Sequence, residues 1–255
     1  MKKKAVRTAA HDEQSIRQRA YFFLQRKIAS REFSAGSAVS ELSVAKELGI
    51  SRTPVREAIG QLVAEGLLEQ IPNRGVVVVQ LTRNDIVDLY EMREALEVYA
   101  AGKAAGLPLN SGDLERLQSF ADQILVLRNE LIESGCAELN TEQMHRFVVC
   151  DLGFHTLLMR LAANARILKV VNETRLMIRI FAIQRTGHTG ADLERIHQQH
   201  RDVLRAVSER DVERAKRIVS EHIQNSQQER LAEHDHWERE NSLKANLPVY
   251  IALPG

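Results

Sequence analysis

The sequence predicts a mostly α-helical protein in two parts: a small N-terminal part of helices with one β-hairpin, and a larger part built only of helices. Three observations predict this fold class. Apolar residues recur at helical spacing over most of the chain. Two short β-like runs flank the turn-forming tetrapeptide Pro72-Asn73-Arg74-Gly75. After Leu81 the sequence contains no convincing strand pattern.

Length and composition restrict the class of protein. The 255 residues are enough for two modest domains, and 44% hydrophobic with 27% charged residues is ordinary for a soluble globular protein. No stretch approaches the ~20 apolar residues of a membrane span, and no apolar signal core follows the basic N-terminus. The two cysteines, Cys136 and Cys150, form neither a disulfide framework nor a metal-ligand pair. We therefore expect a cytoplasmic protein.

The N-terminal part begins with an expected flexible basic tail over residues 1–12. Between Ser15 and Ser30 the apolar residues form one helical stripe. This stripe consists of Ile16, Ala20, Phe23, Leu24 and Ile28. Ser40 as N-cap and Gly49 as stop then predict a short second helix. Its expected apolar face is Leu42, Ala45 and Leu48.

A third helix is expected to begin with Thr53 as N-cap and Pro54 in the first helical position, and to end at Gly66. Its predicted inward face is Val55, Ala58, Ile59, Leu62 and Val63. The β-like runs 67–71 and 76–80 then form the hairpin. Helix, helix, tight turn, helix and hairpin is the order of a winged helix-turn-helix, which we assign to residues 13–80.

The C-terminal part is expected to be an all-α antiparallel helical bundle over residues 81–236, followed by a C-terminal tail over residues 237–255. The predicted helices are 85–106, 113–134, 141–162, 165–186, 191–208 and 211–235. Short loops between consecutive helices favour antiparallel neighbours. Such a bundle can enclose a ligand pocket.

The start of the third helix carries the residues expected to bind DNA. In a helix-turn-helix the second helix of the motif enters the major groove, and arginine can donate two parallel hydrogen bonds to guanine. Hydroxyl groups and exposed N–H groups at a helix start suit phosphate, and a glycine wing tip allows close approach to the backbone. The expected DNA-binding residues are Ser51, Arg52, Thr53, Arg56, Arg74 and Gly75.

The charge distribution agrees with a polyanionic partner for the N-terminal part. Residues 1–80 hold 13 Lys and Arg against 8 Asp and Glu, whereas the remainder holds 22 against 26. The alternative is that the arginines are solvated surface charges. Two arginines at one helix start, together with a charged wing, favour DNA.

The run Gly49-Ile50-Ser51-Arg52-Thr53-Pro54-Val55-Arg56-Glu57-Ala58 resembles the recognition-helix signature of the GntR family of bacterial regulators. Glu65-Gly66-Leu67 and Pro72-Asn73-Arg74-Gly75 resemble the family's helix end and wing. The resemblance covers residues 14–80. Some members carry a base-contacting arginine where Leu42 stands here, so base readout is expected to depend more on Arg52 and Arg56.

Leu81-Thr82-Arg83-Asn84-Asp85-Ile86 is similar to the start of the helical ligand-binding FCD domain of the FadR-like branch. Many members of that branch hold a divalent metal with one Asp and three His. By this resemblance the ligands here are Asp151, His155, His200 and His222. The Asp-x-x-x-His spacing puts two donors on one helix face. The metal is expected to be zinc, with nickel or manganese as alternatives. A structural role for the Asp-x-x-x-His pair, and His197 in place of His200, stay open.

The resemblance also implies an effector, usually a small carboxylate. Arg93 and Asn164 are the candidate effector-binding residues, since arginine fits a carboxylate bidentately. For each of them a surface or capping role is equally open.

These features predict a homodimeric regulator, a repressor, that binds double-stranded operator DNA and does not associate with a membrane. Two alternatives stay open. One is a metal-dependent enzyme that uses the Asp/His cluster. The other is a scaffold whose winged helix binds protein.

Overall fold

The structure is a computed structural model that describes residues 2–30, 32–181 and 187–245. The chain divides into two compact units, which are described separately below. The N-terminal unit comprises residues 1–82 with 177–181, and the helical unit comprises residues 83–176 with 182–255. None of the helices in the described residues combines the length and the apolar character that crossing a membrane requires.

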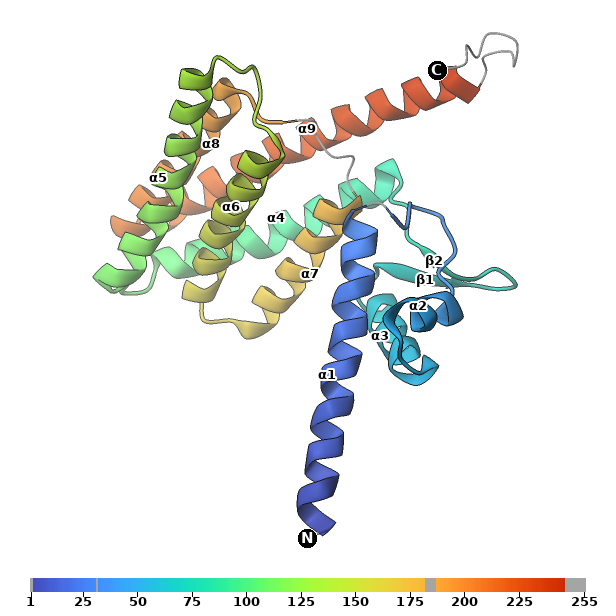
Figure 1. Cartoon of the computed structure of the whole chain (residues 1–255). Helices are drawn as coiled ribbons and strands as arrows, with labels where there is room; N and C mark the ends of the chain where they lie inside the picture. The colour runs from blue at the N-terminus through green and yellow to red at the C-terminus, as the bar shows by residue number, and fades with distance from the viewer. Residues whose placement is uncertain (1, 31, 182–186, 246–255) are drawn as a thin grey trace. The chain divides into compact units, whose positions relative to one another are not determined.

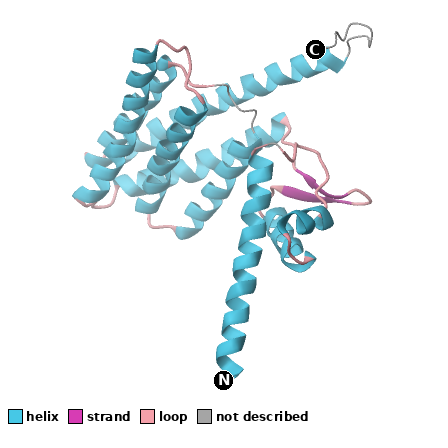
Figure 2. Cartoon of the chain, in the orientation of Figure 1, coloured by secondary structure: helices cyan, strands magenta, loops and turns pink. Residues whose placement is uncertain are grey.

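The N-terminal unit is the predicted winged helix-turn-helix (Figures 1 and 2). Its elements are α1 (Lys2–Ala29), α2 (Glu41–Leu48), α3 (Arg52–Ala64), β1 (Leu68–Ile71) and β2 (Gly75–Val78). The two strands pair antiparallel, with Leu68 opposite Val78 and Ile71 opposite Gly75. Asn73 and Gly75 in the turn have φ values of 63° and 79°, the left-handed conformation that these residue types tolerate best.

Helix α1 starts at Lys2, where the sequence led us to expect a tail over residues 1–12. That prediction was wrong for the secondary structure. The segment contains methionine, alanine, lysine and arginine, all good helix formers, and neither glycine nor proline. Our prediction relied on the apolar stripe, which begins only at Ile16.

The core of the N-terminal unit is made by one face of each helix and by the inner face of the hairpin. Its fully buried members are Ala20, Leu24, Val55, Ala58, Leu62 and Leu67. For α1 and α3 these are the predicted faces. For α2 the prediction was partly wrong, because the helix buries Val44 and Ala45 while Leu42 is 65% exposed. A helix of only eight residues offers too few turns for its stripe to be assigned reliably.

The predicted N-cap is present in α2 but not in α3. The Ser40 hydroxyl accepts a hydrogen bond from the backbone N–H of Ser43 at 3.3 Å, and Gly49 ends α2 with φ 66°. Helix α3, however, begins at Arg52 with Ser51 in the N-cap position, so Thr53 is not the N-cap. Pro54 is still accommodated, because N–H groups in the first turn have no partner within the helix.

The helical unit contains, in order, α4 (Arg83–Ala105), α5 (Ser111–Ser134), α6 (Thr141–Leu161), α7 (Ala165–Phe181) as far as residue 176, α8 (Gly190–Ser208) and α9 (Val212–Ala245). Five of the six helices start and end within two residues of the predicted bounds wherever those bounds lie in the described residues. Helix α9 continues ten residues beyond its predicted end, so the expected tail over residues 237–255 is helical as far as Ala245. Residues 246–255 lie outside the described part of the chain.

Within this unit α4 packs along α9, and α5 packs against α6 and α8. Leucine, isoleucine and alanine dominate its buried positions. In helix α4 the apolar side chains of Met92 and Tyr99 are 44% and 54% exposed, whereas the charged residues Arg93 and Glu97 are buried. A hydrophobic stripe cannot reveal charged residues that are buried against partners on other helices.

Candidate DNA-binding surface and metal centre

The first turn of α3 presents two accessible guanidinium groups. The side chains of Arg52 and Arg56 are 57% and 66% exposed. Ser51 and Thr53 are exposed beside them. The residues that were expected to contact DNA on this helix are therefore brought together at one exposed helix end, where unpaired N–H groups favour an anion.

Glu41, in the first turn of α2, binds both of these arginines, a contact that no sequence pattern indicated. Its carboxylate accepts hydrogen bonds from Arg52 Nη2 and from Arg56 Nε and Nη2, each at 3.0 Å. Hydrogen bonds from Arg56, and to a smaller extent from Arg52, lower the pKa of the Glu41 carboxyl. One carboxylate thus fixes the relative orientation of the two guanidinium planes.

The wing tip carries the other two expected DNA-binding residues. Arg74 and Gly75 are exposed, and the Arg74 backbone N–H donates to Ile71 O at 3.1 Å to close the turn. The Arg74 side chain therefore projects from a tight, backbone-bonded hairpin. A rigid support of this kind lowers the entropic cost of placing a long side chain on DNA.

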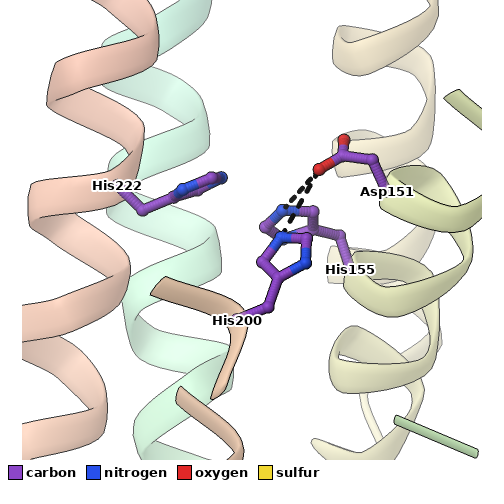
Figure 3. A group of neighbouring side chains, drawn as sticks. All are labelled: Asp151, His155, His200 and His222. Carbon is purple, nitrogen blue, oxygen red and sulfur yellow. Dashed lines mark ion pairs between the residues drawn. The ribbon is translucent and has the colours of Figure 1, made fainter. Parts of the chain in front are cut away.

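Four side chains from three helices meet inside the helical unit (Figure 3). Helix α6 supplies Asp151 and His155, α8 supplies His200 and α9 supplies His222. One donor atom from each residue lies within 4.8 Å of the others. Asp151 Oδ1 is 3.6 Å from His155 Nε2 and 3.4 Å from His200 Nε2, and His222 lies opposite them.

The protonation states of this cluster suit a cation. Burial lowers the pKa of His155 to about 4 and holds the pKa of His222 well below its usual value. Burial alone would raise the pKa of the Asp151 carboxyl, but the charge of protonated His155 and the nearby ring nitrogens of His155 and His200 outweigh it and keep that pKa well below normal. At neutral pH Asp151 is therefore a carboxylate, and His155 and His222 are neutral imidazoles, the form that binds metals.

Unsatisfied nitrogens provide a further test of fit. In the described residues, both ring nitrogens of His155 and of His200 are buried with no hydrogen-bond partner. His222 Nδ1 lies 2.8 Å from Gln199 Oε1, which can only accept, so Nδ1 carries the proton and Nε2 keeps its lone pair. The cluster thus combines a carboxylate oxygen of the half-buried Asp151 with nitrogen donors from three buried imidazoles, a donor set that suits a divalent metal ion.

The structure also decides between the two candidate histidines of α8. His200 belongs to the four-residue cluster, whereas His197, although buried, does not. The ring of His200 stacks on Phe154 at a centroid distance of 4.1 Å, which fixes its orientation.

A buried ion cluster lies against the four residues, and two of its members were missed by the sequence reasoning. Glu97 of α4 is 3.7 Å from His155 Nδ1 and is completely buried. Its carboxylate accepts from Arg93 Nε at 2.9 Å, from Arg175 Nε at 3.0 Å and from Arg175 Nη2. The two arginines hold the pKa of Glu97 well below normal although burial opposes them. Arg93, a predicted effector residue, also lies over the Tyr90 ring at 4.8 Å.

Asn164, the other predicted effector residue, caps α7. Its side-chain oxygen accepts from the backbone N–H groups of Arg166 and Ile167 at 3.1 and 3.2 Å. The capping role that the sequence left open is therefore present, and an effector role for Asn164 stays a prediction.

Comparison with known proteins assigns both units. The family model for bacterial regulatory proteins of the gntR family matches residues 16–78, and the model for the FCD domain matches residues 88–225, more than half of the chain. This chain belongs to the GntR family of bacterial regulators, in its FCD branch. It is therefore a DNA-binding transcription regulator and not an enzyme.

Relatives of known name support this assignment. A probable D-xylose utilization operon transcriptional repressor of Paenarthrobacter nicotinovorans is 30% identical over 79% of this chain and 82% of the relative. The Nta operon transcriptional regulator of Aminobacter aminovorans is 32% identical over 76% of this chain and 85% of the relative. Because the aligned regions cover more than three quarters of this chain, the similarity to these regulators includes residues of both units.

Solved structures share the fold. Escherichia coli McbR/YncC matches with a TM-score of 0.63 at 18% identity, covering 83% of this chain and 94% of that protein. A putative transcriptional regulator GntR from Rhodococcus sp. RHA1 matches with a TM-score of 0.62 at 24% identity, covering 86% and 98%. At such identities the likeness establishes the architecture alone.

Proposed function

We propose that this GntR-family protein is a homodimeric repressor whose affinity for its operator is controlled by a small carboxylate effector, bound with a divalent metal ion in the helical unit. The observation that carries the proposal is the convergence of Asp151, His155, His200 and His222 within 4.8 Å inside an FCD domain. The name of the relative from Paenarthrobacter nicotinovorans supports a repressor rather than an activator.

DNA readout begins at α3. In the proposed complex Arg52 and Arg56 enter the major groove and donate to base edges or phosphates, while Ser51 and Thr53 contact the DNA backbone. Arg74 and Gly75 of the wing contact the adjacent backbone or minor groove. Two copies of this chain present two such helices to a pseudo-palindromic operator, with half-sites about one helical turn apart.

The four clustered residues would hold the ion, zinc in the first instance and nickel or manganese as alternatives. When bound, the ion supplies a Lewis-acid site for a carboxylate oxygen. Arg93 and Arg175 are linked to this cluster through their shared partner Glu97, which lies 3.7 Å from His155, and in the proposal they bind the rest of the effector. Asp151 and the three imidazoles come from three helices. In the proposal, effector binding to the metal therefore changes how α6, α8 and α9 pack against one another.

The testing experiment measures DNA binding and ligand binding in the same protein. An operator is first obtained by in vitro selection from random duplexes. Operator affinity is then measured by fluorescence anisotropy with zinc, with chelator, and with zinc plus a panel of hydroxy, sugar and dicarboxylic acids. We expect at least one acid to change affinity by roughly 5- to 150-fold, the usual range of allosteric coupling, and the change to vanish with Asp151→Asn. If affinity is the same under all conditions, the proposed control is wrong.

A further inference from the structure

A second group of potential metal ligands lies on α9, beyond residue 225, where the FCD match ends. His234, Asp235 and Glu238 each bring one donor atom to within 4.8 Å of the others. His234 Nδ1 is 3.9 Å from Asp235 Oδ1 and 4.0 Å from Glu238 Oε2. None of the three residues belongs to the Asp151 cluster.

His234 is the unusual member of this group. It is only 6% exposed, and its Nδ1 atom is buried with no hydrogen-bond partner among the described residues. Buried polar atoms are nearly always satisfied, so an orphaned nitrogen needs an explanation. The i, i+4 spacing places the Glu238 carboxylate next to it on the same helix face. A cation between these atoms would satisfy the nitrogen and both carboxylates at once.

The charged side chains around His234 also favour the binding of a cation. Asp235 Oδ1 accepts a hydrogen bond from Arg83 Nε at 3.1 Å, whereas in the described part of the chain the Glu238 carboxylate forms no ion pair with a lysine or an arginine. Two carboxylates against one guanidinium give the group a net negative charge. An imidazole nitrogen with two carboxylate oxygens is a donor set that suits zinc, nickel, cobalt or manganese.

The geometry requires little adjustment. Two ligands at about 2.1 Å from a tetrahedral ion lie about 3.4 Å apart, roughly half an ångström closer than His234 Nδ1 lies to either carboxylate oxygen here. The side chains of Asp235 and Glu238 are 41% and 59% exposed, so both can move that far without disturbing the core.

We propose that His234, Asp235 and Glu238 form a second divalent-metal site, with water in the remaining positions. The site binds more weakly than the Asp151 cluster, because it has three protein ligands instead of four and its carboxylates face solvent. The ion shares Asp235 with Arg83, the first residue of α4, so metal binding alters how that residue is held. The proposal does not depend on the function proposed above.

The sequence contains one tryptophan, and it reports on this site. The Trp237 ring lies 6.3 Å from the His234 ring, centroid to centroid. Co²⁺ and Ni²⁺ have open d shells and quench indole emission at short range. We therefore expect titration of the full-length protein with Co²⁺ to give saturable quenching of Trp237. Asp151→Asn, which damages only the first cluster, should quench in the same way.

Two substitutions test the ligands. Glu238→Gln keeps the shape of an exposed side chain and should raise the Co²⁺ concentration for half-quenching by at least about tenfold, since even outer-sphere partners of a metal site change affinity by that much. His234→Asn should abolish the saturable phase, with circular dichroism confirming that the helices are intact. Unchanged quenching in Glu238→Gln, absence of saturable quenching in the wild type, or loss of quenching in Asp151→Asn would each overturn the proposal.

Discussion

Replacing Glu97 with glutamine should destabilise the helical unit severely. The Glu97 side chain has no exposed surface, and its two arginine partners, Arg93 and Arg175, have side chains that are 7% and 10% exposed. The substitution keeps the volume and removes the negative charge, so two buried guanidinium groups lose their counterion. Breaking a buried ion pair from one side typically costs about 3–5 kcal/mol.

The assay is thermal unfolding followed by circular dichroism. For a unit of this size 1 kcal/mol corresponds to roughly 2–4 °C in Tm, so Glu97→Gln should lower Tm by roughly 6–20 °C. Glu130→Gln is a matched control, because Glu130 also receives two hydrogen bonds from one arginine, Arg146, but with side chains 38% and 41% exposed. Its Tm should stay at the wild-type value, as for most solvent-exposed pairs.

A companion variant separates charge from shape. Glu97→Gln combined with Arg175→Gln removes one positive and one negative charge, so it should recover part of the lost Tm. If Glu97→Gln unfolds within 2 °C of the wild type, Glu97 is not a buried counterion. The placement of Arg93 and Arg175 as effector-binding residues would then lose its basis.

Three further predictions concern DNA and metal. Arg52→Ala and Arg56→Ala should each cost about 1–3 kcal/mol of operator binding measured by anisotropy; wild-type affinity in both variants would contradict base readout. Glu41→Gln should lower the ratio of operator to arbitrary-DNA affinity, because it releases both guanidinium groups from their common carboxylate; an unchanged ratio would show that Glu41 does not orient them. Chelator should lower the Tm of the zinc-loaded protein by roughly 5–10 °C, the value for a ligand present at about 100 times its Kd. His200→Ala should remove this shift, and a shift that persists in the variant would place the ion elsewhere.

The parts of the fold that local chemistry determines were predictable. The helix bounds of the bundle follow from capping residues and apolar periodicity, and the hairpin turn follows from Asn73 and Gly75 in left-handed conformations. Gly49 likewise ends α2 where the sequence predicted. Errors arose where two local signals competed, as at Thr53 and Ser51. Both residue types can cap a helix, and only the backbone conformation shows that Ser51 occupies the N-cap position of α3.

The candidate sites likewise contain some residues that the sequence indicated and others that only the structure revealed. The Asp151 and His155 pair was visible as an i, i+4 spacing, and its extension to His200 and His222 rested on resemblance to a family. Glu97 and Arg175 are 78 positions apart in the sequence, and Glu41 and Arg56 are 15 apart. No spacing rule links such residues, because their contact depends on how separate helices pack.

The charges gathered in the helical unit explain why an anion is the expected effector. Asp151 and Glu97 contribute two negative charges, Arg93 and Arg175 contribute two positive charges, and the low pKa of His155 and of His222 leaves these imidazoles neutral. The charges of these six groups are therefore balanced. A divalent ion on the four donors would leave a positive excess in a buried region, where uncompensated charge is costly. A carboxylate that binds the ion offsets half of this excess, whereas a neutral sugar offsets none of it. The same side chains that make the cluster suitable for a metal thus make an acidic effector the better ligand of the metal-loaded protein.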